Sequence, residues 1–450
     1  MNLRAVSVLS SVTLISSIAM AISLGNFEGE SRKEFKSPRN LTELCVIGKK
    51  WPGADYRSDD IKKEATLCGY DFYTNMGVCP KYNSTNPAIL LLEPNAQYTK
   101  QQIDASNCDV KKMGVKTEAK FKQSITCSYT PAILAYYHLS RIFGNAGRVP
   151  PAVIRTMDIS IHKRLTDKAI NTLNGTNKPI LASWEKVLEV HQNPRFFPAV
   201  VDAQSTQFYG ALSDNPKNEE QYVDVSGVGK YDTRYERFMN QEPFKRLISS
   251  ASVSQMVGTS DFARVAQTVL QLKDVSDMIL MDTLLNQQDR IGNIHYKFFW
   301  YYIDPVAKKV VRQKSDAKWV NDVIQVPDQE NAAMAGKQAA LVKEMLLKDN
   351  DCGVTKTNMM KKYKVLEQIR HMSYNTYKKF MAFEQALATP AGQDYFVKEL
   401  LFSPSEFRNL QRNAAEAKQI LKTKCQSNQL RFDVDIELYV PGASAPTPSC

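Results

Sequence analysis

The cysteines constrain this chain more than any other feature, because all eight follow an apolar N-terminal leader. The leader has Arg4 at its basic end, an apolar stretch up to Met20 and an A-x-A sequence at its end, so residues 1–21 are predicted to be a cleaved signal peptide. An even number of cysteines in an exported chain predicts a framework of disulfides. The cysteines are Cys45, Cys68, Cys79, Cys108, Cys127, Cys352, Cys425 and Cys450.

The positions of the cysteines limit the pairing without fixing it. Five of them lie within residues 45–127, so at least one of these five must pair outside the group if every cysteine is bonded. A bridge between Cys425 and Cys450 would fix the proline-containing tail, and the other pairings stay open. No C-x-x-C sequence occurs and the five histidines are scattered, which argues against a metal site built from these residues.

Hydropathy and charge set the broad class of the protein. After the leader, no apolar run approaches the ~20 residues that span a bilayer, so we expect an exported protein, periplasmic or secreted, without stable membrane insertion once the signal is cleaved. A hydrophobic fraction of 43% is enough for a sizeable core. The net charge is +11, but the basic residues are dispersed and no arginine-rich tract occurs, so specific nucleic-acid binding is not expected.

The order of local patterns predicts an α+β protein, with a β-rich first part and a mainly helical second part. Strand patterns lie at 89–92 and 119–125, a helix starts at Pro131, and further strand patterns fill 197–212. Helices are predicted at 259–272, 275–286, 329–346, 359–389 and 393–423, the last with a capping box from Ser403, and a β-hairpin at 294–312. The predicted units are the signal peptide (1–21), a β-rich N-terminal lobe with one helix (22–150), a C-terminal lobe with a catalytic loop and a helical bundle (151–425) and a tail (426–450).

The stretch 286–295 is the most informative for chemistry, because Asp289 precedes Asn293 by four positions between a predicted helix and the hairpin. Phosphoryl transfer needs a carboxylate that orients the acceptor hydroxyl and takes its proton. It also needs an amide or acid oxygen beside a divalent metal that neutralises the phosphates. A second acid is expected after the hairpin, where Asp349 and Asp351 lie in a turn. Mg²⁺ and Mn²⁺ prefer such hard oxygen ligands.

On these residues the chain resembles the secretory-pathway kinases of the Golgi casein kinase and four-jointed type, and more distantly the HipA-type and phosphatidylinositol kinases. The resemblance covers residues 115–355. The helix 135–141 with the following V-P-P is similar to the family's N-lobe helix and its exit. The matching stretches are 135–141, 148–151, 208–210, 278–290 and 347–350, the last resembling the family's L-D-N metal motif.

The resemblance implies a bilobal protein-kinase-like fold and a role for each matched residue. Asp289 would be the catalytic base or the carboxylate that orients the acceptor. Asp349 would bind the metal, with Asn293 as a second ligand. Lys122 would contact the nucleotide phosphates, and Lys120 is its rival because residues two apart lie on one face of a strand.

The chain also departs from the family pattern. Ile133 stands where the family has the helix glutamate that pairs with the phosphate-binding lysine. The gap of 60 positions between Asp289 and Asp349 is longer than a hairpin requires, so it would have to hold the helix predicted at 329–346. The alternatives for the metal-binding acid are therefore Asp349, Asp351 and Asp304.

The sequence thus predicts an exported atypical kinase. It would use ATP with Mg²⁺ or Mn²⁺ to phosphorylate a hydroxyl of a protein or glycan acceptor. One alternative is a secreted pseudokinase or binding scaffold, which has the same fold but does not turn over ATP. Another is a kinase-fold nucleotidyl transferase. The acceptor, the oligomeric state and the host kingdom stay open.

Overall fold

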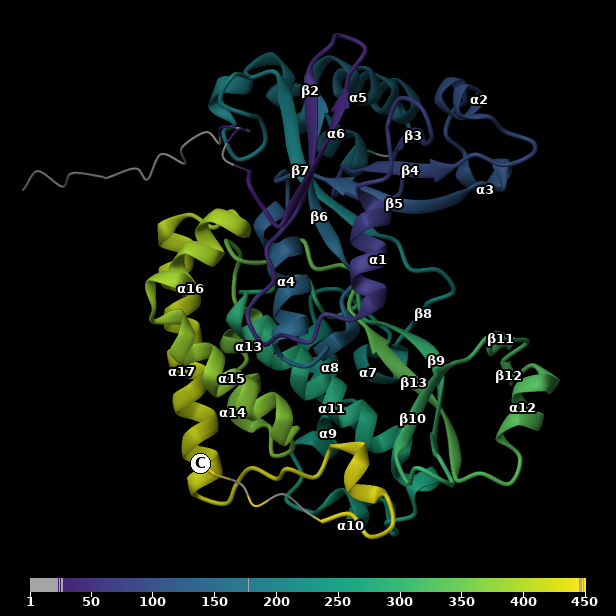
Figure 1. Cartoon of the computed structure of the whole chain (residues 1–450), viewed down its shortest axis with the longest axis vertical. Helices are drawn as coiled ribbons and strands as arrows, with labels where there is room; N and C mark the ends of the chain where they lie inside the picture. Colours follow the sequence, from purple (N-terminus) through teal and green to yellow (C-terminus); the bar gives the residue numbers. More distant parts are fainter. Residues whose placement is uncertain (1–22, 24, 26, 177, 445–446, 448) are drawn as a thin grey trace, which may run out of the picture.

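The structure confirms the mixed α+β class. The computed structural model describes residues 23, 25, 27–176, 178–444, 447 and 449–450, and the predicted signal peptide lies outside them. A large antiparallel sheet with helices forms the upper part in Figure 1, and helices with a smaller sheet beside them form the lower part.

The large sheet has seven strands, and every neighbouring pair is antiparallel. In sheet order the strands are β1 (Ser31–Lys36), β2 (Thr42–Ile47), β6 (Ala152–Asp158), β7 (Gln207–Asp214), β5 (Lys116–Lys122), β4 (Ile89–Glu93) and β3 (Gly77–Pro80). β6 and β7 lie inside the sheet although they follow residue 150 in the sequence. The large sheet therefore contains strands from both sides of the boundary predicted at residue 150 and continues to Asp214.

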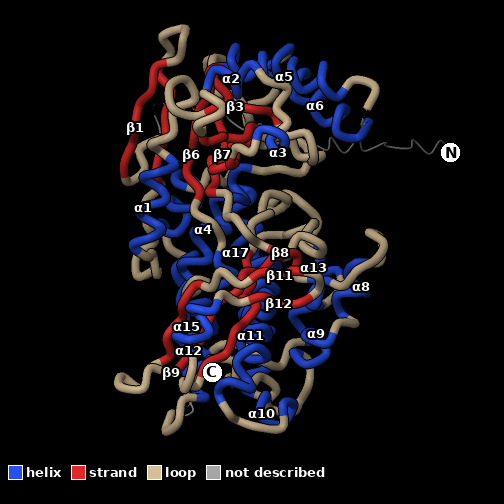
Figure 2. Tube along the Cα trace, turned by 90° about the vertical axis from the view of Figure 1, so that its right-hand side faces the viewer, coloured by secondary structure: helices blue, strands red, loops and turns tan. Residues whose placement is uncertain are grey.

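The two faces of this sheet pack against different helices, since successive side chains of a strand point to opposite faces. Ile154 of β6 belongs to the core that contains α4 (Thr130–Ile142). Its neighbour Val153 belongs to the core that contains α5 (Ile159–Leu173) and α6 (Lys178–Gln192). In both views α4 lies between the large sheet and the lower helices (Figure 1, Figure 2).

The region predicted as a lobe with one helix contains more helices than that. Besides α4, its described residues form α1 (Ser58–Leu67), α2 (Lys100–Ala105) and α3 (Val110–Met113). α1 is mostly polar, with few apolar positions to reveal a helical period, and α2 and α3 are too short to show one. The strand predicted at 197–212 is confirmed only in its last part, as β7.

The lower part is built around α11 (Phe262–Leu284), which is buried along most of its length. The two helices predicted at 259–272 and 275–286 are thus one, capped by Asp261, whose side chain accepts from the backbone N–H of Arg264 at 3.1 Å. α15 (Tyr374–Leu387) and α17 (Pro404–Gln426) lie beside it (Figure 1). α17 has the predicted capping box at Ser403.

The smaller sheet corrects another prediction. The hairpin of β9 (His295–Ile303) and β10 (Val310–Lys314) is confirmed. The prediction of a helix at 329–346 is wrong. Only α12 (Asp328–Met334) is helical, and β13 (Ala339–Leu346) pairs with β9. Local alanine content favoured a helix there, and the pairing with β9 overrides it.

All eight cysteines are paired, as Cys45–Cys68, Cys79–Cys108, Cys127–Cys352 and Cys425–Cys450. The bridge that leaves the N-terminal group and the bridge at the tail are both as predicted. Disulfides are typical of oxidising compartments, so this framework is compatible with an exported protein. Among the helices that the structure describes, none has the length and apolar content to cross a membrane.

Candidate active site

The register of the smaller sheet brings the Asp289 loop and the Asp349 turn together. Leu346, the last residue of β13, lies opposite His295, the first residue of β9. The Asp289 loop runs into β9 and Asp349 follows β13, so both lie at the same end of the sheet. The long gap between the two acids is an insertion between neighbouring strands. It consists of β10, β11 (Lys318–Val320), β12 (Val323–Gln325) and α12.

Arg290 fastens these two segments to each other. It is fully buried and donates from Nε and Nη2 to the Asp282 carboxylate at 2.9 and 3.0 Å. Nη2 also donates to Asn350 Oδ1 at 2.7 Å. The hydroxyl of Tyr136, on α4, donates to Asp282 Oδ1 at 2.6 Å. The loop, the turn beside Asp349, α11 and α4 therefore form one hydrogen-bonded unit.

Lys122 links the large sheet to the Asp349 turn. It is the last residue of β5, and its side chain is only 6% exposed. Its Nζ lies 2.7 Å from Asp351 Oδ2 and 3.8 Å from Asp349 Oδ1. Burial alone would lower the pKa of Lys122, but Asp351 and Asp349 outweigh burial and hold this pKa above its usual value.

Three further lysines surround the same turn. Burial pulls the pKa of Lys120 down to about 7, against the opposing field of Asp349. Burial also lowers the pKa of Lys81, next to β3. The Asp349 carboxyl feels burial too, but Lys122, Lys120, Lys81 and Lys348 hold its pKa well below the usual range. Among the described residues, the ammonium groups of Lys81 and Lys120 have no hydrogen-bond or ion-pair partner, whereas Lys348 pairs with Glu219.

Asp289 is held by an arginine on one side only. Its Oδ1 accepts from Arg234 Nη1, at the start of α8 (Arg234–Met239), and lies 3.4 Å from the Tyr231 hydroxyl. Arg234 Nη2 also donates to the Gln288 carbonyl at 2.7 Å. No partner of Asp289 Oδ2 occurs in the described part of the chain, and the side chain is 30% exposed. One carboxylate oxygen is thus positioned and the other is available to a ligand.

The residues present fit a divalent metal that shares its coordination with phosphates. No cluster of three or more His, Cys, Asp or Glu side chains occurs among the described residues, so the chain would not enclose a metal alone. Mg²⁺ is usually held by one or two protein groups plus substrate phosphates and water. Asp349 is ionised and 28% exposed. Asn293 donates Nδ2 to the Asp289 carbonyl at 2.7 Å, and its Oδ1 has no partner within the described residues.

The two alternative acids differ from Asp349. Asp351 is 5% exposed and engaged by Lys122, so it is placed as an ion-pair partner. Asp304 lies in the turn at the far end of β9, where it accepts from the backbone N–H of Val306 and Ala307 at 2.9 and 2.7 Å. β9 is about 27 Å long, so Asp304, beyond its far end, lies away from the end of the sheet where Asp289 and Asp349 meet.

A disulfide closes the site on the side of the large sheet. Cys127 follows β5 and Lys122, and Cys352 follows Asp351 directly. The backbone N–H of Gln288 donates to the Cys352 carbonyl at 3.0 Å. The bridge therefore joins the strand that carries the lysine to the turn that carries the acids and to the Asp289 loop.

The apolar residue at position 133 accounts for the role of Asp351 as the partner of Lys122. Ile133 is 7% exposed in the apolar core of α4, so α4 supplies no acid to Lys122 at this position. Sequence reasoning also missed Lys81, Lys348 and Arg234. Lys348 precedes Asp349 directly, which was a usable signal. Lys81 and Arg234 reach the site only through the tertiary fold.

Gly210 of β7 permits the close approach of β7 to Lys122. A Cβ at this position would lie 2.2 Å from the Lys122 carbonyl oxygen. We expect Gly210→Ala to lower the free energy of unfolding by about 1–3 kcal/mol and to displace Lys122. Urea denaturation measures the first effect, and the affinity for ATP, the ligand expected from the sequence, measures the second. Gly258→Ala is also strained, because Gly258 has a φ of +76°, but it lies at the end of α10 (Val253–Val257), outside the candidate site, and should leave ATP affinity unchanged. Equal ATP affinity in Gly210→Ala and the unaltered protein would contradict the expectation.

No family model matches the chain, and no curated protein sequence matches it significantly.

Proposed function

We propose that this protein is an exported atypical kinase that transfers the γ-phosphate of ATP to a hydroxyl of a protein or glycan. The observation that carries the proposal is the convergence of Lys81, Lys120, Lys122 and Lys348 on Asp349 and Asp351. Lys348 also pairs with Glu219, so the four lysines face three carboxylates, and an excess of one positive charge remains when Lys120 is protonated. The ammonium groups of Lys81 and Lys120 lack a partner among the described residues. A polyphosphate is the ligand that would neutralise this excess.

The arrangement of the fold supports a bilobal kinase-like interpretation. The lysines come mainly from the large sheet, and Asp289 comes from the loop after α11 in the lower part. α4 contacts both parts, and its Tyr136 reaches Asp282 beside the loop. Phosphoryl transfer depends mostly on positioning and electrostatic stabilisation, and two rigid parts meeting at one site suit it.

Asp289 is assigned the role of binding the acceptor hydroxyl. Its Oδ2 would accept the hydrogen bond of the acceptor hydroxyl and take its proton as the oxygen bonds to the γ-phosphorus, while ADP leaves. Arg234 on Oδ1 fixes the orientation of the carboxylate. Orientation of the hydroxyl is therefore its main contribution, with proton uptake late in the transfer.

Lys122 and Lys120 are assigned to the phosphates, and Asp351 replaces the missing helix glutamate as the partner of Lys122. Asp349 and Asn293 are the residues that would hold Mg²⁺ or Mn²⁺. When bound, such a metal neutralises phosphate charge. The chain's own contribution is a preformed set of cations and one carboxylate aimed at the acceptor.

A second candidate is a nucleotide-binding scaffold without turnover. The ion pair of Asp289 with Arg234 favours it, because this pair already engages the carboxylate that a kinase would need for the acceptor hydroxyl. This candidate predicts ATP binding with no transfer of phosphate.

The deciding experiment follows γ-labelled and α-labelled ATP with the mature, oxidised protein and Mn²⁺ or Mg²⁺. The acceptors are water, the protein itself, a serine/threonine peptide library and an oligosaccharide pool. Movement of the γ-label that Asp289→Ala stops supports the kinase. Binding alone supports the scaffold, and release of labelled pyrophosphate supports nucleotidyl transfer. Absence of ATP binding with either metal would contradict all three.

The pKa of Lys120 predicts proton uptake on ATP binding. In the free protein a pKa of about 7 leaves this amine mostly neutral at pH 8.5, and a neighbouring phosphate favours its charged form. ATP binding at pH 8.5 should therefore take up close to one proton, and uptake should vanish below about pH 6, where Lys120 is already charged. Calorimetry in Tris and in Tricine measures this as a buffer-dependent enthalpy.

Two variants test the assignment of this proton. Lys120→Met should remove the uptake at pH 8.5. Lys116→Met, at the exposed start of the same strand, should keep it. Identical enthalpies in the two buffers for the unaltered protein would show that Lys120 does not meet the phosphates.

A further inference from the structure

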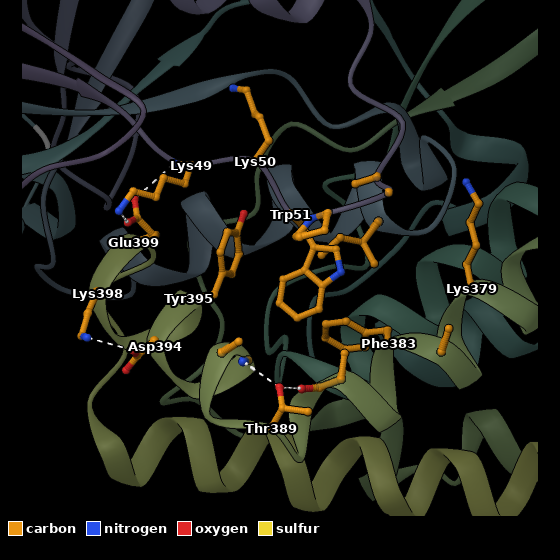
Figure 3. Close-up of a pocket in the computed structure, with 18 of the residues that line it drawn as sticks. Lys49, Lys50, Trp51, Lys379, Phe383, Thr389, Asp394, Tyr395, Lys398 and Glu399 are labelled. Atoms are coloured by element: carbon orange, nitrogen blue, oxygen red, sulfur yellow. Dashed lines mark hydrogen bonds and ion pairs between the residues drawn. The ribbon is translucent and has the colours of Figure 1, made fainter.

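A cavity of about 770 Å³ shares no lining residue with the candidate active site. It lies between the segment 49–54, α15 and the turn formed by α16 (Pro390–Asp394) and η4 (Tyr395–Glu399). Figure 3 shows its labelled side chains coming from these segments. Its volume is in the range of small-molecule sites in proteins.

One wall of the cavity is aromatic. Trp51 lies between Tyr395 and Phe383 (Figure 3), with ring centroids 5.0 and 5.6 Å from its own. Tyr395 and Phe383 are buried, whereas Trp51 is half-buried and offers part of its ring. The indole Nε1 has no hydrogen-bond partner in the described part of the chain. Trp51 therefore presents an apolar surface together with a free donor.

Small side chains keep the cavity open. Ala382 and Ala386 lie one turn apart on α15, on the same helix face, and both line it. Gly392 lines it from α16, where an added Cβ would lie 2.4 Å from the Ala386 carbonyl oxygen. A larger residue at Ala386 would fill the space from the exposed side of α15.

The rim is polar but balanced in charge. Every lysine on it pairs with a carboxylate, although two of these carboxylates, Asp55 and Glu64, do not line the cavity themselves. Glu28 also lines the cavity, 3.7 Å from Lys49. The pairs are Lys49–Glu399 at 3.2 Å, Lys398–Asp394 at 2.9 Å, Lys379–Asp55 and Lys50–Glu64. This balance gives an ionic ligand of either sign no net attraction.

We propose that this cavity binds a neutral carbohydrate, with a sugar ring stacked on Trp51. A sugar has an apolar C–H face that suits the indole and hydroxyls at its edge that both donate and accept. The ammonium and carboxylate groups of the rim can donate to and accept from those hydroxyls. An acyl chain would instead cover rim groups without giving them hydrogen bonds, at a desolvation cost.

The proposal does not depend on kinase activity, so its test uses the full mature protein without nucleotide. A printed array of neutral glycans with hexose, N-acetylhexosamine, deoxyhexose and pentose ends finds the preferred terminal sugar. Titration of the matching free disaccharide, followed by tryptophan fluorescence and saturation-transfer NMR, then gives the affinity. We expect saturable binding that changes less than about twofold between 50 and 500 mM salt, because no net charge is neutralised.

Variants assign the binding to this cavity. Trp51→Ala should weaken it at least about tenfold by removing the stacking surface, and Ala386→Leu should weaken it similarly by filling the space while leaving Trp51 in place. Trp319→Ala removes a partly exposed indole on β11, outside the cavity, and should leave binding unchanged. Circular dichroism confirms that each variant is folded.

Two results would overturn the proposal. The first is an array with no bound neutral glycan. If sodium octanoate then binds the unaltered protein but not Ala386→Leu, the cavity belongs to an apolar ligand. The second is glycan binding that both Trp51→Ala and Ala386→Leu leave intact, which would place the sugar elsewhere on the protein.

Discussion

Replacing Asp289 with asparagine is expected to lower the rate of phosphate transfer by ~10²–10⁴-fold, the usual contribution of a positioned proton acceptor. Asparagine keeps the shape of the side chain and an oxygen for Arg234, but it cannot take the proton of the acceptor hydroxyl. The lysines proposed to bind the phosphates are untouched, so the affinity for ATP should change by no more than about threefold. Single-turnover transfer of the γ-label and calorimetric ATP binding measure the two effects separately.

The matched control for this variant is Asp304→Asn. Asp304 is another loop carboxylate of the same smaller sheet, but it sits in the hairpin turn at the far end of β9. Its removal should leave transfer unchanged. If Asp289→Asn transfers phosphate as fast as the unaltered protein, the acceptor is served by a different group, and the assignment of Asp289 fails.

Elements with a strong local signal were predictable from the sequence. α4 has an apolar stripe that starts at Pro131, and α17 has a capping box at Ser403. The β9–β10 hairpin has its turn at Asp304 and Pro305. In each case the local pattern and the tertiary contacts favour the same structure, which is where sequence reasoning succeeds.

The errors arose where long-range pairing decides the structure. Residues 339–346 are rich in alanine and leucine, yet β13 forms because β9 offers an edge for eight consecutive pairs. The local pattern near residue 150 indicates a turn, and it gives no sign that β6 and β7 pair in the middle of the large sheet. No window of local sequence contains the strands with which these segments pair.

The candidate site also contains residues that short motifs predict and contacts that only the tertiary fold creates. Asp289, Asn293, Asp349 and Lys122 stand in short motifs, and the structure brings their segments together. The partner of Lys122 could not be predicted, because Asp351 reaches it across the interface between the large sheet and the turn after β13. Spacing alone therefore suggested a metal ligand where the fold makes an ion pair.

That ion pair gives the largest expected effect on stability. Asp351→Asn removes the closer carboxylate from a lysine that is 6% exposed, and leaves only Asp349 at 3.8 Å. Breaking a buried pair by removing one partner usually costs about 3–5 kcal/mol, because the remaining charge stays buried. Urea denaturation of the oxidised protein should show this loss. The exposed pair Lys163–Asp167 is the control, and Asp167→Asn should change the free energy of unfolding by less than about 0.5 kcal/mol.

The double variant Lys122→Met/Asp351→Asn separates the structural from the functional part of this pair. With both charges gone, an apolar side chain fills the space and most of the lost stability should return, to within about 1–2 kcal/mol of the unaltered protein. ATP affinity should not return, because the cation proposed to bind the phosphates is absent. Recovery of stability together with ATP binding would show that Lys122 is purely structural. Failure to recover stability would show that Asp351 stabilises the turn by contacts other than Lys122. The expected combination, a stable protein that no longer binds ATP, would identify the pair as a preformed phosphate site whose positive charge is held in place by Asp351.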